Sequence, residues 1–200
     1  GDHNPAGGAG VTDEERVIRL ALANPVNALV LDRIAALALP DAWLVSGSIF
    51  QAVWNGLAGC DPSHGIADYD VFYFDPDTSY EAEDAVIARC AQAFVDVAAE
   101  VQVRNQARVH LWYPQKFGRP YPRLSCTTEA LSRFLAPCCA VGLSKAGEGY
   151  RIAAPFGLGD LLAMVVRPNP AVEGTSAQYD AKTARWLQHW PGLTVLPWHG

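Results

Sequence analysis

The sequence is poor in positive charge. Its 200 residues include 15 lysines and arginines against 21 aspartates and glutamates, which gives a formal net charge of −6. Proteins that hold nucleic acid over a broad surface need an excess of clustered cations. The composition therefore argues against a broad nucleic-acid-binding surface, although it leaves room for a local cationic pocket.

Long apolar runs are also missing. No segment approaches the roughly 20 consecutive apolar residues that a membrane-spanning helix requires. The chain does not open on an apolar segment with a basic flank, which is the pattern of a secretory signal. We therefore expect a soluble, cytoplasmic protein that has no membrane partner.

Cysteine is present, but not in a pattern that binds a metal. The chain has an odd number of cysteines, and none of them forms a C-x-x-C or accompanies a pair of histidines. We expect these residues to be reduced thiols, most of them packed as small apolar side chains. The five are Cys60, Cys90, Cys126, Cys138 and Cys139.

The apolar content is ample for one packed domain. Half of the residues are hydrophobic, and 200 residues is the size of one large domain. Residues 1–11 are rich in glycine, proline and asparagine, which predicts a flexible segment. We expect a single domain over residues 12–200.

The stretch from residue 44 to residue 74 carries the clearest functional pattern. An apolar run ends at Gly47-Ser48, and an apolar-periodic segment that predicts a helix follows at residues 49–57. The backbone N–H groups at a helix N-terminus favour an anion such as a phosphate. The glycine allows close approach, and the serine can donate a hydrogen bond.

Two carboxylates follow on a predicted strand at residues 68–74. Side chains alternate along a strand, so Asp68 and Asp70 point to the same face. Their repulsion is costly unless a cation lies between them. Mg²⁺ or Mn²⁺ fits, because such ions take one or two carboxylates together with substrate phosphates.

Each of these two motifs has an ordinary structural explanation. A D-x-D is common at a solvated strand edge, and Gly-Ser before a helix is an ordinary N-cap. The two motifs in this order, with the carboxylates inside an otherwise apolar strand, are harder to explain structurally. The combination indicates metal-assisted phosphoryl or nucleotidyl transfer.

The remaining elements follow from caps and periodicity. Thr12 caps a first helix, Pro25 opens a second that runs to about Leu39, and Thr78 caps a further helix that runs to about Ala98. A strand is predicted over residues 100–113. Its polar face, which carries Arg104, Arg108 and His110 among others, suits either solvent or an anionic substrate.

The C-terminal third is predicted to be largely helical. A short helix from Thr128, a hairpin at residues 140–152 and a helix near Asp160 precede a helix at residues 178–190. Lys182 and Arg185 are three residues apart and so share a face of that last helix. They could contact a nucleotide or an acceptor, and a solvated helix face is the alternative.

Several segments resemble a known family. They are VSGSIFQAVWN (45–55), IADYDVFYFD (66–75), NQARVHLWY (105–113), APFGL (154–158), RPN (167–169) and KTARW (182–186). On these segments the sequence resembles bacterial nucleotidyltransferase-like proteins of the DNA polymerase β-like nucleotidyltransferase superfamily. The resemblance runs from about residue 39 to residue 198.

The resemblance implies an α/β (α+β) fold, with a mixed sheet flanked by helices and a helical C-terminal extension. It implies that Gly47 and Ser48 meet the triphosphate and that Asp68 and Asp70 hold the metal ions. A third carboxylate on a neighbouring strand normally completes such a site. Here Gln102 stands where that strand could offer one, and Glu100 is its neighbour on the same face.

The predicted function is transfer of a nucleoside monophosphate from an NTP to an unidentified hydroxyl acceptor. Asp68, Asp70 and Glu100 are the predicted catalytic residues, with Mg²⁺ or Mn²⁺ as cofactor. The acidic charge favours a small-molecule or protein acceptor. The alternative is a catalytically inactive nucleotide-binding or protein-interaction module that retains the fold.

Overall fold

Two capped helices begin the described part of the chain. The computed structural model describes residues 10–172, 174 and 176–199, so most of the segment predicted to be flexible, residues 1–9, lies outside it. The Thr12 hydroxyl accepts a hydrogen bond from Glu15 N–H and caps α1 (Asp13–Leu22). Asn24 caps α2 (Pro25–Ala36), which has Pro25 in its first turn. The second helix is three residues shorter than predicted.

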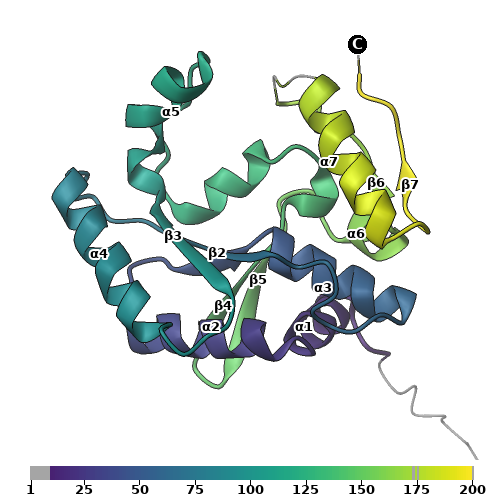
Figure 1. Ribbon diagram of the computed structural model, residues 1–200, viewed down its shortest axis with the longest axis horizontal. Coiled ribbons are helices and arrows are strands. Elements are labelled where there is room, and N and C mark those ends of the chain that lie inside the picture. The colour runs from purple at the N-terminus through teal and green to yellow at the C-terminus, as the bar shows by residue number, and fades with distance from the viewer. Residues whose placement is uncertain (1–9, 173, 175, 200) are drawn as a thin grey trace, which may run out of the picture.

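A mixed five-stranded sheet forms the centre of the fold. Its strands are β1 (Trp43–Val45), β2 (Asp68–Tyr73), β3 (Glu100–Asn105), β4 (Gly142–Ala146) and β5 (Gly149–Ala153). They lie in the order β3-β2-β1-β4-β5, with β2 and β3 parallel and the other pairs antiparallel. With α1 and α2 running below this sheet in Figure 1, the predicted α+β class with a mixed sheet is confirmed.

The two faces of β2 have different surroundings. Tyr69, Val71 and Tyr73 are buried in one hydrophobic core that also holds side chains from α1, α2 and α3 (Gly47–Ala58). Asp68 and Asp70, which alternate with them along the strand, therefore point to the opposite face. A strand with one apolar and one polar face thus places both carboxylates outside the main core.

The third strand is much shorter than predicted. It ends at Asn105 and continues as a 3₁₀ turn at Gln106–Arg108 and then as helix α5 (Val109–Phe117), so the strand prediction over residues 106–113 is wrong. The physical reason is the Asn105 side chain. Its Oδ1 accepts hydrogen bonds from the N–H groups of Ala107 and Asp75, both at 3.0 Å, and this caps the turn.

The end of the strand also changes the role of Arg108. Helix α4 (Tyr80–Ala93) is capped by Ser79, one residue beyond the predicted cap, and carries Glu83. Arg108 pairs with this carboxylate at 2.5 Å and also donates to the Thr78 carbonyl. Arg108 therefore does not lie on the predicted strand face for an anionic substrate.

The C-terminal region packs a helix against α3. A 3₁₀ helix at Thr127–Arg133 and the predicted hairpin β4-β5 lead to α6 (Gly159–Ala163), β6 (Val165–Val166), α7 (Ser176–His189) and β7 (Thr194–Val195). Trp186 on α7 meets Phe50 and Trp54 of α3 with ring centroids 5.3 and 5.7 Å apart. The Trp190 indole donates to Asn55 Oδ1 at 2.7 Å. These contacts hold one face of α7 against α3.

No helix in the described ranges is long and apolar enough to cross a membrane.

Candidate functional site

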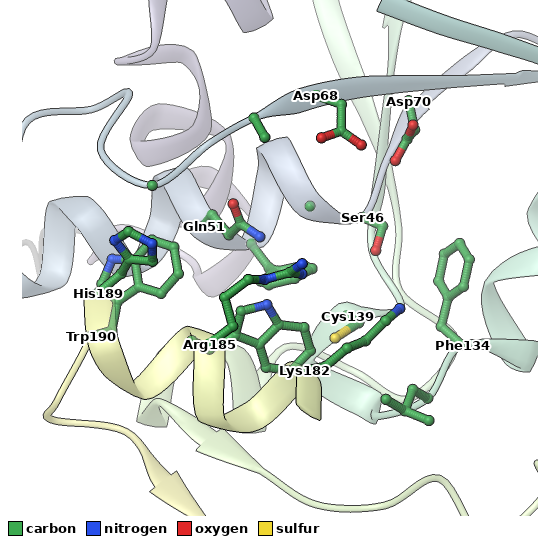
Figure 2. Close-up of a pocket in the computed structure, with 16 residues that line it drawn as sticks. Ser46, Gln51, Asp68, Asp70, Phe134, Cys139, Lys182, Arg185, His189 and Trp190 are labelled. Atoms are coloured by element: carbon green, nitrogen blue, oxygen red, sulfur yellow. The ribbon is translucent and has the colours of Figure 1, made fainter. Parts of the chain in front are cut away.

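A cavity of about 350 Å³ lies where β2, the start of α3 and α7 meet. Figure 2 shows Asp68 and Asp70 on one side of it, Ser46 beside them, and Lys182 and Arg185 on the facing helix. Gly47 also lines the cavity. The structure therefore brings together five of the seven predicted site residues, from three separate elements.

The two carboxylates share the cavity because they are two residues apart on β2. Burial, followed by the nearby charge of Asp68, raises the pKa of Asp70, whereas Arg104 and Lys182 oppose the rise, and the net result is a pKa of about 6. An acid with a raised pKa in a cleft is typical of a functional site. Here the cause is a charge held partly out of water next to a like charge.

The start of α3 lines another side of the cavity. The Ser46 carbonyl accepts hydrogen bonds from the N–H groups of Ile49 and Phe50, at 2.8 and 3.0 Å. The N–H groups of Gly47 and Ser48 lie in the first helical turn, where helix geometry offers no acceptor within the helix. An anion in the cavity would meet the positive end of this helix.

The serine side chain that lines the cavity is Ser46. The Ser48 side chain is buried, and its hydroxyl finds no partner among the described residues. The backbone carbonyl of Ser48 accepts a hydrogen bond from the Asn27 side chain. Ser48 can therefore contribute its backbone N–H, while the hydroxyl that lines the cavity comes from the preceding position. Ser46 has φ 60° and ψ −117°, a strained conformation for a residue other than glycine.

The facing helix contributes two cations. Lys182 and Arg185 both line the cavity, and Figure 2 shows their side chains directed toward the carboxylate side. Neither makes an ion pair with a carboxylate in the described part of the chain. They are therefore placed to meet a negatively charged ligand.

Glu100 occupies a different position. The parallel register pairs it with Asp68 and pairs Gln102 with Asp70, so all four share one face of the sheet. Glu100 is exposed, and Gln102 Nε2 donates to its carboxylate at 3.1 Å. Its charge contributes to the raised pKa of Asp70, yet it is not among the described residues that line the cavity.

The donor set is compatible with a magnesium ion held jointly with a triphosphate. The described residues include no cluster of three or more histidine, cysteine, aspartate or glutamate side chains arranged to hold a metal. Mg²⁺ needs no such cluster, because it keeps waters and takes one or two carboxylates plus substrate phosphates. Asp68 and Asp70 would supply those carboxylates.

Several lining residues were missed by sequence reasoning. The position of Ser46 directly before Gly47 could have suggested it as a lining residue. Its backbone conformation has no signal in the sequence. Gln51 lies one turn into α3, and His189 lies one turn beyond Arg185, so both were within reach of helix periodicity. Phe134 and Cys139 arrive from elsewhere in the fold, and no local pattern marks them.

Comparison with known proteins agrees with this geometry. A solved NMR structure, described as revealing a CCA-adding enzyme head domain, superimposes with a TM-score of 0.72 at 26% sequence identity. The match covers 94% of this chain and 98% of that one. A search of curated proteins finds no match. The sequence profile of a family described as nucleotidyltransferase matches residues 32–195, and the chain therefore belongs to the nucleotidyltransferase family.

Proposed function

We propose that this chain transfers a nucleoside monophosphate from an NTP to a hydroxyl acceptor, with Mg²⁺ or Mn²⁺ as cofactor. The observation that carries the proposal is the meeting of two carboxylates, a helix N-terminus and two cations in one cavity. Two acids alone would suit many cation sites. The positive groups opposite them call for a ligand that is both metal-binding and strongly anionic, and a triphosphate is such a ligand.

Each element has a part in holding the triphosphate. The first-turn N–H groups of α3 and the Ser46 hydroxyl face one set of phosphate oxygens. Lys182 and Arg185 face the triphosphate from α7, where charge-assisted hydrogen bonds favour phosphate. The ligand would be fixed between α3 and α7, and its reacting phosphorus would lie near β2.

Asp68 and Asp70 would hold the divalent ion. When bound, it neutralises phosphate charge and stabilises charge that develops in the transition state. The acceptor oxygen forms a bond to the α-phosphorus, the bond from that phosphorus to the bridging oxygen breaks, and pyrophosphate leaves. The hydroxyl proton must pass to a nearby base, for which an ionised carboxylate of β2 or Glu100 is the candidate.

The test is pyrophosphate release from NTP in the presence of Mg²⁺ or Mn²⁺ and a mixture of hydroxyl acceptors. Asp70→Asn should abolish release and weaken metal binding in calorimetry. Asp84→Asn removes the same charge from the exposed side of α4 and is the matched control. Equal metal affinity and equal release in Asp70→Asn and the control would overturn the site assignment.

One observation favours a second candidate, a nucleotide-binding module that performs no transfer. Two acids line the described cavity, while Glu100 lies exposed against Gln102. If Glu100 is the third acid, Glu100→Gln should abolish transfer, whereas Gln102→Glu should raise it or leave it intact. NTP affinity without pyrophosphate release under any of these conditions would establish the binding module instead.

A small-molecule or protein acceptor and a cytoplasmic location are parts of the same proposal. The acidic net charge supports a small-molecule or protein acceptor. The need of the proposed reaction for an NTP supports the cytoplasmic location.

A further inference from the structure

A second and larger cavity adjoins the first. It has a volume of about 950 Å³ and lies between β2, β3, α5, the loop at residues 119–122 and the 3₁₀ helix at Thr127–Arg133. Asp70, Phe134 and Lys182 line both cavities. A ligand in the second cavity can therefore reach the carboxylate and the cation that face the proposed triphosphate site.

The second cavity is positively charged, in contrast to the chain as a whole. Its described lining residues include five lysines or arginines and one acid, Asp70, whereas the chain carries a net charge of −6. Arg104, Lys116 and Arg133 make no ion pair with a described carboxylate. The Nε–H of Arg133 is buried and finds no acceptor among the described residues. Such cations favour an anionic ligand.

The same cavity is lined by aromatic rings. Tyr113 lies with its ring centroid 4.6 Å from that of Phe117 and 4.8 Å from that of Tyr121. Arg133 lies over the Tyr121 ring at 4.7 Å, and Lys116 lies 5.3 Å from the Phe117 ring. Phe117 is 45% exposed, so an apolar ring is open to solvent beside a cation. A planar ring on the ligand could stack on this surface.

We infer that the second cavity binds the acceptor, and that the acceptor is a small phosphorylated molecule that carries an aromatic ring. The inference rests on the proposed transferase function. The cations bind the phosphate, the aromatic surface of α5 binds the ring, and the shared wall at Asp70 places an acceptor hydroxyl near the α-phosphorus of the NTP. The volume is of the size found for small-molecule sites.

The probe for this inference is 2-aminopurine riboside 5′-monophosphate, whose fluorescence is quenched when the purine stacks on an aromatic side chain. The titration is run with Mg²⁺ and a saturating non-hydrolysable NTP analogue, so that the first cavity is filled. Quenching is expected, with weaker binding of the unphosphorylated riboside and of ribose 5-phosphate. If the unphosphorylated riboside or ribose 5-phosphate bound as tightly as the probe, the requirement for both a phosphate and a ring would be wrong.

The variant that tests the location is the double substitution Arg104→Gln with Lys116→Gln. Both side chains are exposed, so the fold should survive. Loss of charge-assisted bonds to a phosphate should lower probe affinity by about tenfold or more. Arg123→Ala removes an exposed cation of the neighbouring segment that does not line the cavity, and it should leave the affinity unchanged.

Two results separate the inference from the proposed function. If the NTP analogue binds but the double variant and wild type bind the probe equally, the acceptor site is wrong and the NTP site stands. If the NTP analogue does not bind at all, the proposed function fails first. If single-stranded oligonucleotides bound more tightly as their length increased, the acceptor would be the end of a nucleic acid and the small-molecule acceptor would be wrong.

Discussion

The replacement of Asp70 by asparagine should stabilise the metal-free protein in a way that depends on pH. In the folded chain, burial and the Asp68 charge hold the pKa of Asp70 at about 6, against an ordinary value of 3.8. The folded protein therefore binds more protons than the unfolded chain between these two values. The wild type loses stability as pH rises through that window, and Asp70→Asn does not, because it cannot ionise.

The size of the effect follows from the same two values. At 1.36 kcal/mol for each pKa unit, the difference corresponds to about 3 kcal/mol. Asp70→Asn should therefore exceed the wild type in free energy of unfolding by up to about 3 kcal/mol above pH 7. Below the ordinary pKa of an aspartate, the difference attributable to ionisation should vanish.

The assay is urea denaturation with EDTA at a series of pH values from about 3 to 8. Asp84→Asn is the matched control, since it removes a carboxylate on the exposed side of α4. Asp68→Asn is a second test, because it removes a charge that raises the pKa of Asp70. It should shift the pH dependence of the remaining carboxylate to lower pH. A difference between wild type and Asp70→Asn that stays constant across the whole range would refute the reasoning.

Three other predictions concern the cavity and its support. Replacement of both Lys182 and Arg185 by alanine should lower the NTP affinity measured by calorimetry, and the loss should be smaller at high salt because salt screens charge. An unchanged NTP affinity would show that both side chains belong to a solvated helix face. Ser46→Gly should raise the free energy of unfolding by about 1 kcal/mol, since glycine tolerates φ 60°, and a decrease in urea denaturation would contradict this. Glu83→Gln should cost up to about 3 kcal/mol because it leaves the partly buried Arg108 without its carboxylate, and a wild-type denaturation midpoint would show that the pair is dispensable.

Local patterns were enough to predict that Asp68 and Asp70 lie side by side, as they do in the cavity. Strand alternation has a period of two, so a D-x-D inside an apolar strand places Asp68 and Asp70 on one face wherever that strand lies in the fold. The helix that follows Gly47 was predicted for the same kind of reason, because apolar periodicity and a preceding glycine act over a few residues. The capping residues Thr12 and Asn24 with Pro25 are equally local, and the helices begin where they indicate.

Local patterns failed where a side chain reached across the chain. The polar alternation after Glu100 suggested a strand to residue 113, but the Asn105 amide bonds to Asp75 and Ala107 and turns the backbone into a helix. That turn pairs Arg108 with Glu83 and carries the aromatic residues of α5 to the edge of the second cavity. The sequence of residues 100–113 cannot show that Asp75 lies within hydrogen-bonding distance of Asn105.

Only the tertiary structure decided what faces the carboxylates. Lys182 lies more than a hundred residues from Asp70 in the chain, and the aromatic contacts of Trp186 with α3 bring it to the cavity. The choice of Ser46 over Ser48 as the lining residue likewise depends on the tertiary structure, which buries the Ser48 side chain and leaves Ser46 at the cavity. On β2 and α7 the sequence by itself determined which chemical groups share a face, because the strand and helix periods are local. Their convergence is a property of long-range packing, which local periodicity cannot encode.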